Sequence, residues 1–299
     1  MNWIKKHQLY CDIHYAIETC ITGLSSKQEP DYIAALVTRL PSKLSNILGR
    51  QYNVGGCFIH QKPCAKFCNP ALQHYKSPEI GDLLIVYKEN SPKGELYNAL
   101  LLQAKKTGNI YNTTISAGDT HQLILYTRWP RFQYCRAGYL NGQERSINPK
   151  TITTGAQYLL IDENKFYNTP CGHHTFWCAY ADEHLTASKS LALQIINLLE
   201  FQTGRPFVSK RLHMDHWSQM IWDLLQISAN SYFNRRHAGF NNTPRGSEIM
   251  DFFTEICNQD SNQDLNQVLN QVLNQVLNQD KENYGISTLL IVRNSQEQE

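Results

Sequence analysis

The stretch that decides the fold is Pro78-Glu79-Ile80-Gly81-Asp82-Leu83-Leu84-Ile85-Val86, followed after a polar turn by Ala99-Leu100-Leu101-Leu102-Gln103-Ala104-Lys105-Lys106. Two apolar runs joined by the turn composition of Glu89–Gly94 predict a β-hairpin. The hairpin brings Asp82, which opens the first strand, to the same end of the sheet as Gln103 and Lys105, which close the second. Because side chains alternate along a strand, Gln103 and Lys105 share one face.

These residue types suit metal-assisted phosphodiester hydrolysis. A divalent cation that holds a phosphate needs oxygen ligands, and the attacking water must lose a proton. Asp82 and Gln103 offer the oxygens, and Lys105 offers a group that can orient or deprotonate the water.

The order of these residues resembles the restriction-endonuclease-like PD-(D/E)xK superfamily, in which Asp is followed by a hairpin and then by Glu or Gln, any residue, and Lys. The upstream helix of that family carries an acidic residue, and Glu29 stands at the start of a predicted helix here. The helix that follows the QxK strand matches residues 119–126, with Gln122 as a contact to phosphate or to metal-bound water. The resemblance covers residues 25–135 and, more loosely, the strand at residues 157–161.

The resemblance implies a fold and a set of roles. The fold is α/β, a mixed β-sheet flanked by helices. Asp82 is the anionic ligand of Mg²⁺, for which Mn²⁺ can substitute. Gln103 supplies a second oxygen, and Glu29 acts directly or through a metal-bound water. Gln103 departs from the Glu of most members and removes one negative charge, so weaker metal binding is expected than in a Glu version.

Two neighbouring charged residues leave alternatives open. Lys106 points to the face opposite Lys105, where it either contacts the nucleic-acid backbone or is simply solvated. Glu79 precedes Asp82 by three residues, and it is either an auxiliary ligand or a strand-entry residue.

Charge along the chain favours a nucleic-acid partner. The net charge is only +2, but residues 251–299 hold eight acids and two bases, which leaves a net charge of +8 on residues 1–250. Arg128 lies in a segment rich in aromatic residues and arginine, and Arg235 and Arg236 lie in a basic stretch. Such residues bind phosphates irrespective of sequence, although they also form ordinary solvated surfaces.

Periodicity predicts the rest of the organisation. We expect one domain over residues 1–299, with a core at 25–165 and a mainly helical C-terminal half whose helical portion covers 185–256. Helices are predicted at 8–24, at 31–48 with a kink or break at Pro41, at 185–201 and at 213–233. Residues 257–280 form an Asn/Gln-rich tetrapeptide array, helical or disordered, inserted before a final strand at 285–292. No apolar stretch reaches the roughly 20 residues of a membrane span, and no signal peptide is evident, so cytoplasm is expected.

Nine cysteines raise the question of metal or disulfide bonding. Two groups have zinc-competent residue types but no standard zinc-motif spacing: Cys57, His60, Cys64 and Cys68, and Cys171, His173, His174 and Cys178. A cytoplasmic setting and cysteines such as Cys135 among aromatic residues disfavour disulfides.

The sequence therefore predicts a Mg²⁺-dependent nuclease of the PD-(D/E)xK type, with defence or restriction as a role by analogy. An endodeoxyribonuclease is the favoured form, although the hairpin residues act on the phosphate and distinguish neither DNA from RNA nor endonuclease from exonuclease. Homodimerisation is compatible with double-strand cleavage. The rivals are a non-catalytic nucleic-acid-binding or scaffold protein that kept the fold, and a zinc-dependent interaction module built on residues 57–68.

Overall fold

The computed structural model describes residues 3–24, 27–59, 63–92, 94–164, 168–169, 171–209, 213–234, 240–242 and 284–294. The helices are α1 Trp3–Ile21, α2 Glu29–Leu48, α3 Thr120–Arg128, α4 Leu191–Leu199 and α5 His216–Asn234, with 3₁₀ turns η1 Pro70–Leu72, η2 Ala117–Asp119 and η3 Gly138–Leu140. The strands are β1 Tyr52–Cys57, β2 Cys64–Phe67, β3 Leu83–Ser91, β4 Gly94–Thr107, β5 Thr113–Thr114, β6 Phe132–Cys135, β7 Glu144–Arg145, β8 Ala156–Asp162, β9 Asn168–Thr169, β10 Gly172–His173, β11 Phe176–Ala179, β12 His184–Leu185, β13 Ala187–Ser190, β14 Arg205–Phe207, β15 Phe240–Asn242 and β16 Ser287–Arg293.

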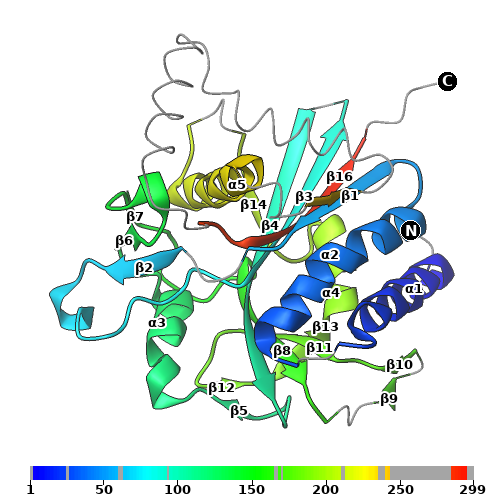
Figure 1. The fold of residues 1–299 in the computed structure, drawn as a ribbon, viewed down its shortest axis with the longest axis horizontal. Coiled ribbons are helices and arrows are strands. Elements are labelled where there is room, and N and C mark those ends of the chain that lie inside the picture. The colour runs from blue at the N-terminus through cyan, green and yellow to red at the C-terminus, as the bar shows by residue number, and fades with distance from the viewer. Residues whose placement is uncertain are drawn as a thin grey trace.

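The centre of the fold is a mixed sheet with the order β13-β11-β8-β4-β3-β16-β1-β15, and β14 adds to one end of β4. β3 and β4 form the predicted antiparallel hairpin, in which Leu83 pairs with Leu102. β8 joins β4 in parallel, and β16 joins β3 in parallel on the opposite side. The predicted mixed sheet flanked by helices is therefore present, and the hairpin lies at its middle (Figure 1).

Two buried clusters cover the two faces of this sheet. Alternate residues of β4 divide between them, since Leu100 and Leu102 pack with α1, α2 and α4, whereas Ala99 and Leu101 pack with α3 and α5. Figure 1 shows α1, α2 and α4 grouped on one side, with α3 and α5 on the other. The odd-numbered face of β4, which carries Gln103 and Lys105, is thus the face toward α3.

Helix α2 runs without interruption through Pro41, so the break that was one of the two predicted alternatives is absent. A proline leaves the carbonyl four residues earlier without its helical hydrogen bond, and here that carbonyl belongs to Val37. It faces Gly56 of β1, where an added Cβ atom would lie 1.9 Å from the Val37 oxygen. The backbone of α2 next to Pro41 therefore packs directly against Gly56, where a residue with a side chain would not fit.

The described residues do not support the expectation of a mainly helical C-terminal half. The predicted helix at 185–201 begins only at Leu191, because residues 184–190 form β12 and β13, and the Ser190 side chain accepts a hydrogen bond from the Leu193 amide at the helix start. α5 matches the prediction at 213–233 closely, but β14 and β16 are strands of the sheet. β16 is the predicted final strand, and its apolar run is buried between β3 and β1.

The Asn/Gln-rich array at 257–280 lies outside the described residues. The assignment of residues 1–299 to one domain stays a prediction. Among the described helices, none is both long enough and apolar enough to cross a membrane.

Candidate active site at the end of the central hairpin

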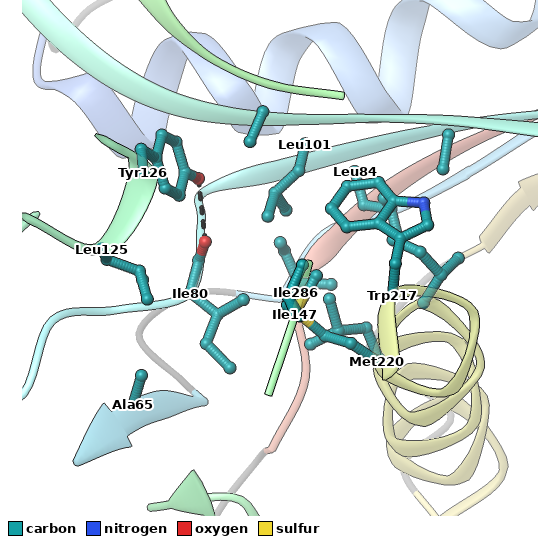
Figure 2. Packing of buried hydrophobic residues seen from close by; sticks show 14 of the residues in the cluster. Ala65, Ile80, Leu84, Leu101, Leu125, Tyr126, Ile147, Trp217, Met220 and Ile286 are labelled. Atoms are coloured by element: carbon teal, nitrogen blue, oxygen red, sulfur yellow. Dashed lines mark hydrogen bonds between the residues drawn. The ribbon is translucent and has the colours of Figure 1, made fainter. Parts of the chain in front are cut away.

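Asp82 lies at the first position before β3 and is fixed there by its neighbours. Its amide donates to the Leu102 carbonyl (2.9 Å), which sets it opposite Gln103. Two residues before Asp82, the Ile80 carbonyl accepts a hydrogen bond from the Tyr126 hydroxyl of α3 (2.8 Å), as Figure 2 shows. Gly81 fits between these elements because an added Cβ atom would lie 2.7 Å from Leu101 and 3.0 Å from the Tyr126 oxygen.

One carboxylate oxygen of Asp82 is fully engaged with β4. Asp82 Oδ2 accepts hydrogen bonds from the Ala104 amide (2.7 Å) and from Gln103 Nε2. Burial raises the pKa of Asp82 to about 8; the Ala104 hydrogen bond opposes the rise, and the charges of Glu79 and Glu29 add to it. When no cation is bound, the protonated form of Asp82 is therefore favoured near neutral pH.

Gln103 uses its amide nitrogen on Asp82, and this orients its carbonyl oxygen. Gln103 Oε1 is buried and has no hydrogen-bond partner in the described structure. A buried carbonyl without a hydrogen bond lowers the stability of the fold by on the order of 1 to 3 kcal/mol, so it is rarely kept without a function. An oxygen without a partner next to a carboxylate fits the donor set that Mg²⁺ prefers.

Glu29 reaches the same strand end from the other layer. As the first residue of α2, it accepts a hydrogen bond from the Lys106 amide through Oε1 (2.7 Å). Asp82 and Glu29 therefore bind successive even-numbered amides of β4, at Ala104 and Lys106. The predicted upstream acid is thus brought to the end of the hairpin, although its oxygen reaches the backbone and not the Lys105 side chain.

Lys105 is on the predicted face and has a partner that the sequence reasoning missed. Its ammonium group forms an ion pair with Asp119 Oδ2 (2.6 Å), and Ser116 Oγ donates to the same oxygen (2.8 Å). The hydrogen bond from Lys105 is the main cause that lowers the pKa of Asp119. The only signal in the sequence was that Asp119 is the first residue of the predicted helix at 119–126, where a role as helix cap is a sufficient reason for an acid.

Gln122 and Glu79, the two auxiliary residues, take different positions. Gln122 is buried in α3, and its Nε2 has no hydrogen-bond partner among the described residues. Glu79 forms an isolated β-bridge with Cys64, and its charge contributes to the raised pKa of Asp82, so both alternatives for this residue remain open.

The predicted nucleic-acid contacts are spread over the chain. Lys106 lies on the face opposite Lys105, where its ammonium group pairs with Glu163 (2.8 Å). Arg128 is exposed at the last position of α3. Trp129 and Tyr126, from the same aromatic segment, are fully buried and unavailable for stacking on bases. Arg235 and Arg236 lie outside the described residues.

The remaining oxygens define what could hold a cation. Asp82 Oδ1, Gln103 Oε1 and Glu29 Oε2 are not used in the hydrogen bonds described above. Within the described ranges, the only group of three or more His, Cys, Asp or Glu residues whose ligand atoms all lie within 4.8 Å is His7, Cys11 and Cys171. The acids of the candidate site are therefore more widely spaced than a closed metal cage, and Asp82 with Gln103 forms its closest pair.

The cysteines are arranged differently from either expected zinc group. Cys57 and Cys64 are buried and are not disulfide-bonded, and His60 lies outside the described residues. Cys64 faces Cys135 across β2 and β6. Cys11 and Cys171 form a disulfide, against the expectation that disulfides are disfavoured. The expectation was wrong because it rested on compartment and spacing, whereas folding brings together two cysteines that are 160 residues apart.

Comparisons with known proteins give no relative: no family model matches the chain, and neither a curated protein nor a solved structure matches it.

Proposed function

We propose that this protein is a metal-dependent nuclease of the PD-(D/E)xK type that hydrolyses phosphodiester bonds, with DNA as the substrate rather than RNA. The observation that carries the proposal is the Asp82–Gln103 pair, joined across the central hairpin with a buried, unpaired oxygen on Gln103. Lys105, two residues further along the same face, completes the set that phosphodiester hydrolysis needs.

The residues have distinct roles in this proposal. Asp82 and Gln103 would hold the cation, with Glu29 closing the site through its second oxygen. When bound, Mg²⁺ supplies charge stabilisation at the phosphate and lowers the pKa of a coordinated water. Lys105 orients the attacking water and balances the negative charge that develops on it, and Asp119 fixes the position of the ammonium group. Gln122 donates its unpaired Nε2–H to a phosphate oxygen or to a water on the cation.

The cation must displace a proton from Asp82. Deprotonation in a buried site beside Glu29 and Glu79 is unfavourable, which is why the pKa of Asp82 is raised. A divalent cation supplies the missing positive charge, so binding and ionisation occur together. We therefore expect metal affinity to rise with pH up to about pH 8.

The same observations favour one rival, a nucleic-acid-binding protein without catalysis. A protonated Asp82 and a Lys105 held by Asp119 would also describe a site that has stopped binding metal. The two proposals differ in one respect that can be measured, since only the nuclease needs Mg²⁺ at Asp82. As part of the nuclease proposal, we also propose a cytoplasmic location, a homodimer, and a role in defence or restriction.

The decisive experiment is a cleavage assay on plasmid, single-stranded DNA and RNA in Mg²⁺, Mn²⁺ or EDTA. Asp82→Ala and Lys105→Ala should each lower the rate by about 100-fold or more, because each removes a group that acts on the metal or the water. Glu95→Gln is the matched control, because Glu95 pairs with Lys88 (2.6 Å) at the far end of the same hairpin. Equal rates in the Asp82 variant and the control would reject the nuclease.

A further inference from the structure

A second group of ligand-type side chains lies on α1, away from the hairpin. His7 and Cys11 are four residues apart and so share one face of the helix. Cys171 belongs to the loop that enters β10, and its sulfur joins the same group. His7 Nε2 lies 3.9 Å from Cys11 Sγ, and the three ligand atoms all lie within 4.8 Å of one another.

Two thiolates and an imidazole are a zinc ligand set. Soft sulfur donors combined with histidine select Zn²⁺ over the hard cations that prefer oxygen. His7 is exposed, and both cysteines are partly accessible, so a cation can enter and a water molecule can complete a tetrahedral site. A disulfide removes this capacity, because a bonded sulfur is not a thiolate. The two cysteines therefore have two mutually exclusive uses.

We propose that His7, Cys11 and Cys171 form a zinc site when the Cys11–Cys171 disulfide is reduced. A dithiol reductant gives two electrons and two protons to the S–S bond and becomes a disulfide itself. Zn²⁺ then binds the two sulfurs and releases their two protons to solvent. The bond between α1 and the β10 loop is thereby exchanged for a metal bridge between the same elements.

The surroundings hold the two elements in place in either state. Glu18, further along α1, accepts hydrogen bonds from the Thr175 amide (2.8 Å) and hydroxyl (2.7 Å). The Tyr10 hydroxyl is hydrogen-bonded to His174 Nε2 (2.8 Å). Because these contacts do not involve the sulfurs, reduction leaves His7, Cys11 and Cys171 near one another and lowers the entropy cost of metal binding.

The exchange would matter in a reducing compartment, such as the cytoplasm expected from the sequence. Low-molecular-weight thiols and dithiols of the cytoplasm open exposed disulfides, and a protein that loses such a bond there loses a link between segments 160 residues apart. A zinc bridge keeps that link under reducing conditions. The proposal is independent of catalysis at Asp82, so either can fail without the other.

The test uses the full-length protein, reduced with a phosphine and freed of metal. We expect one Zn²⁺ per chain by a chelator-competition assay, and a Co²⁺–thiolate charge-transfer band when Co²⁺ is used as the probe. Cys11→Ser and Cys171→Ser should abolish both signals, and His7→Gln should weaken binding at least tenfold. Cys68→Ser and His74→Gln are matched controls, because Cys68 is a free, partly accessible thiol and His74 is exposed elsewhere on the surface.

Three results would overturn the proposal. One is a reduced wild-type chain that binds no zinc while circular dichroism shows it folded. Another is zinc binding that survives in Cys11→Ser with unchanged affinity. Before reduction, the wild type should bind no zinc at this site, and stoichiometric binding by the oxidised chain would equally contradict the exclusive use of the two sulfurs.

Discussion

Asp82→Asn should change how the stability of the protein depends on pH. The pKa of this carboxyl is raised from 3.8 to about 8 in the folded state, mainly by burial. A raised pKa means that the associated stability is fully present below about pH 4 and is lost as pH rises through about 8. An asparagine of nearly the same shape cannot ionise, so it escapes this loss.

The size of the effect follows from the shift. Each pKa unit corresponds to a little over 1 kcal/mol, so the whole shift amounts to on the order of 6 kcal/mol of unfolding free energy. Relative to the wild type, the variant should therefore gain on the order of 1 kcal/mol for each pH unit between about pH 5 and pH 8, and the gain should level off above that. Other titrating groups cancel because both proteins contain them.

The measurement is urea unfolding of both proteins at several pH values in EDTA. The unfolding free energies are compared at equal m-values, so that a change in the denatured state is not mistaken for stability. A difference that stays constant from pH 5 to pH 8 would refute the argument, since it would mean that Asp82 is already ionised in the folded protein. Added Mg²⁺ should reduce the slope for the wild type alone, provided that it binds at Asp82.

Three further outcomes can be checked. Gly56→Ala should destabilise the protein by about 3 kcal/mol or prevent folding, as read by thermal unfolding, because the new Cβ atom would meet the backbone oxygen of Val37. Asp119→Asn should lower the cleavage rate less than loss of Lys105 does and should shift its pH profile, because the ammonium group keeps its chemistry but loses its ion pair; an unchanged profile would argue against a positioning role. Gln103→Glu should lower the Mg²⁺ concentration needed for cleavage by adding a negative charge, and an unchanged or higher requirement would contradict the assigned ligand role.

Much of the fold could be read from the sequence because its signals are local. The apolar runs that became β3, β4, β8 and β16 are uninterrupted, and a strand needs little beyond such a run and a turn. The same reading failed at residues 184–190, where short strands have too few residues to show a period. It also allowed a break at Pro41, through which α2 runs without interruption and packs against Gly56 of a distant strand.

In the candidate site, too, the features set by neighbouring residues could be predicted and the long-range contacts could not. Asp82, Gln103 and Lys105 were brought to one strand end by alternation and a single hairpin, which are properties of neighbouring residues. The pairing of Lys105 with Asp119 depends on where α3 docks, and sequence spacing carries no information about that. The Cys11–Cys171 contact was missed for the same reason, since neither cysteine belongs to a recognisable motif.

β16 is synthesised long after β3, the strand beside which it lies in the sheet. Its pairing with β3 joins residues 204 apart, as the Glu89–Arg293 ion pair shows. At a synthesis rate of roughly 5 to 20 residues per second, the edge of β3 waits on the order of 10 to 40 seconds for its neighbour. During that time a long apolar edge is open to any other extended chain. We therefore expect the nascent chain to need protection by chaperones until β16 has left the ribosome.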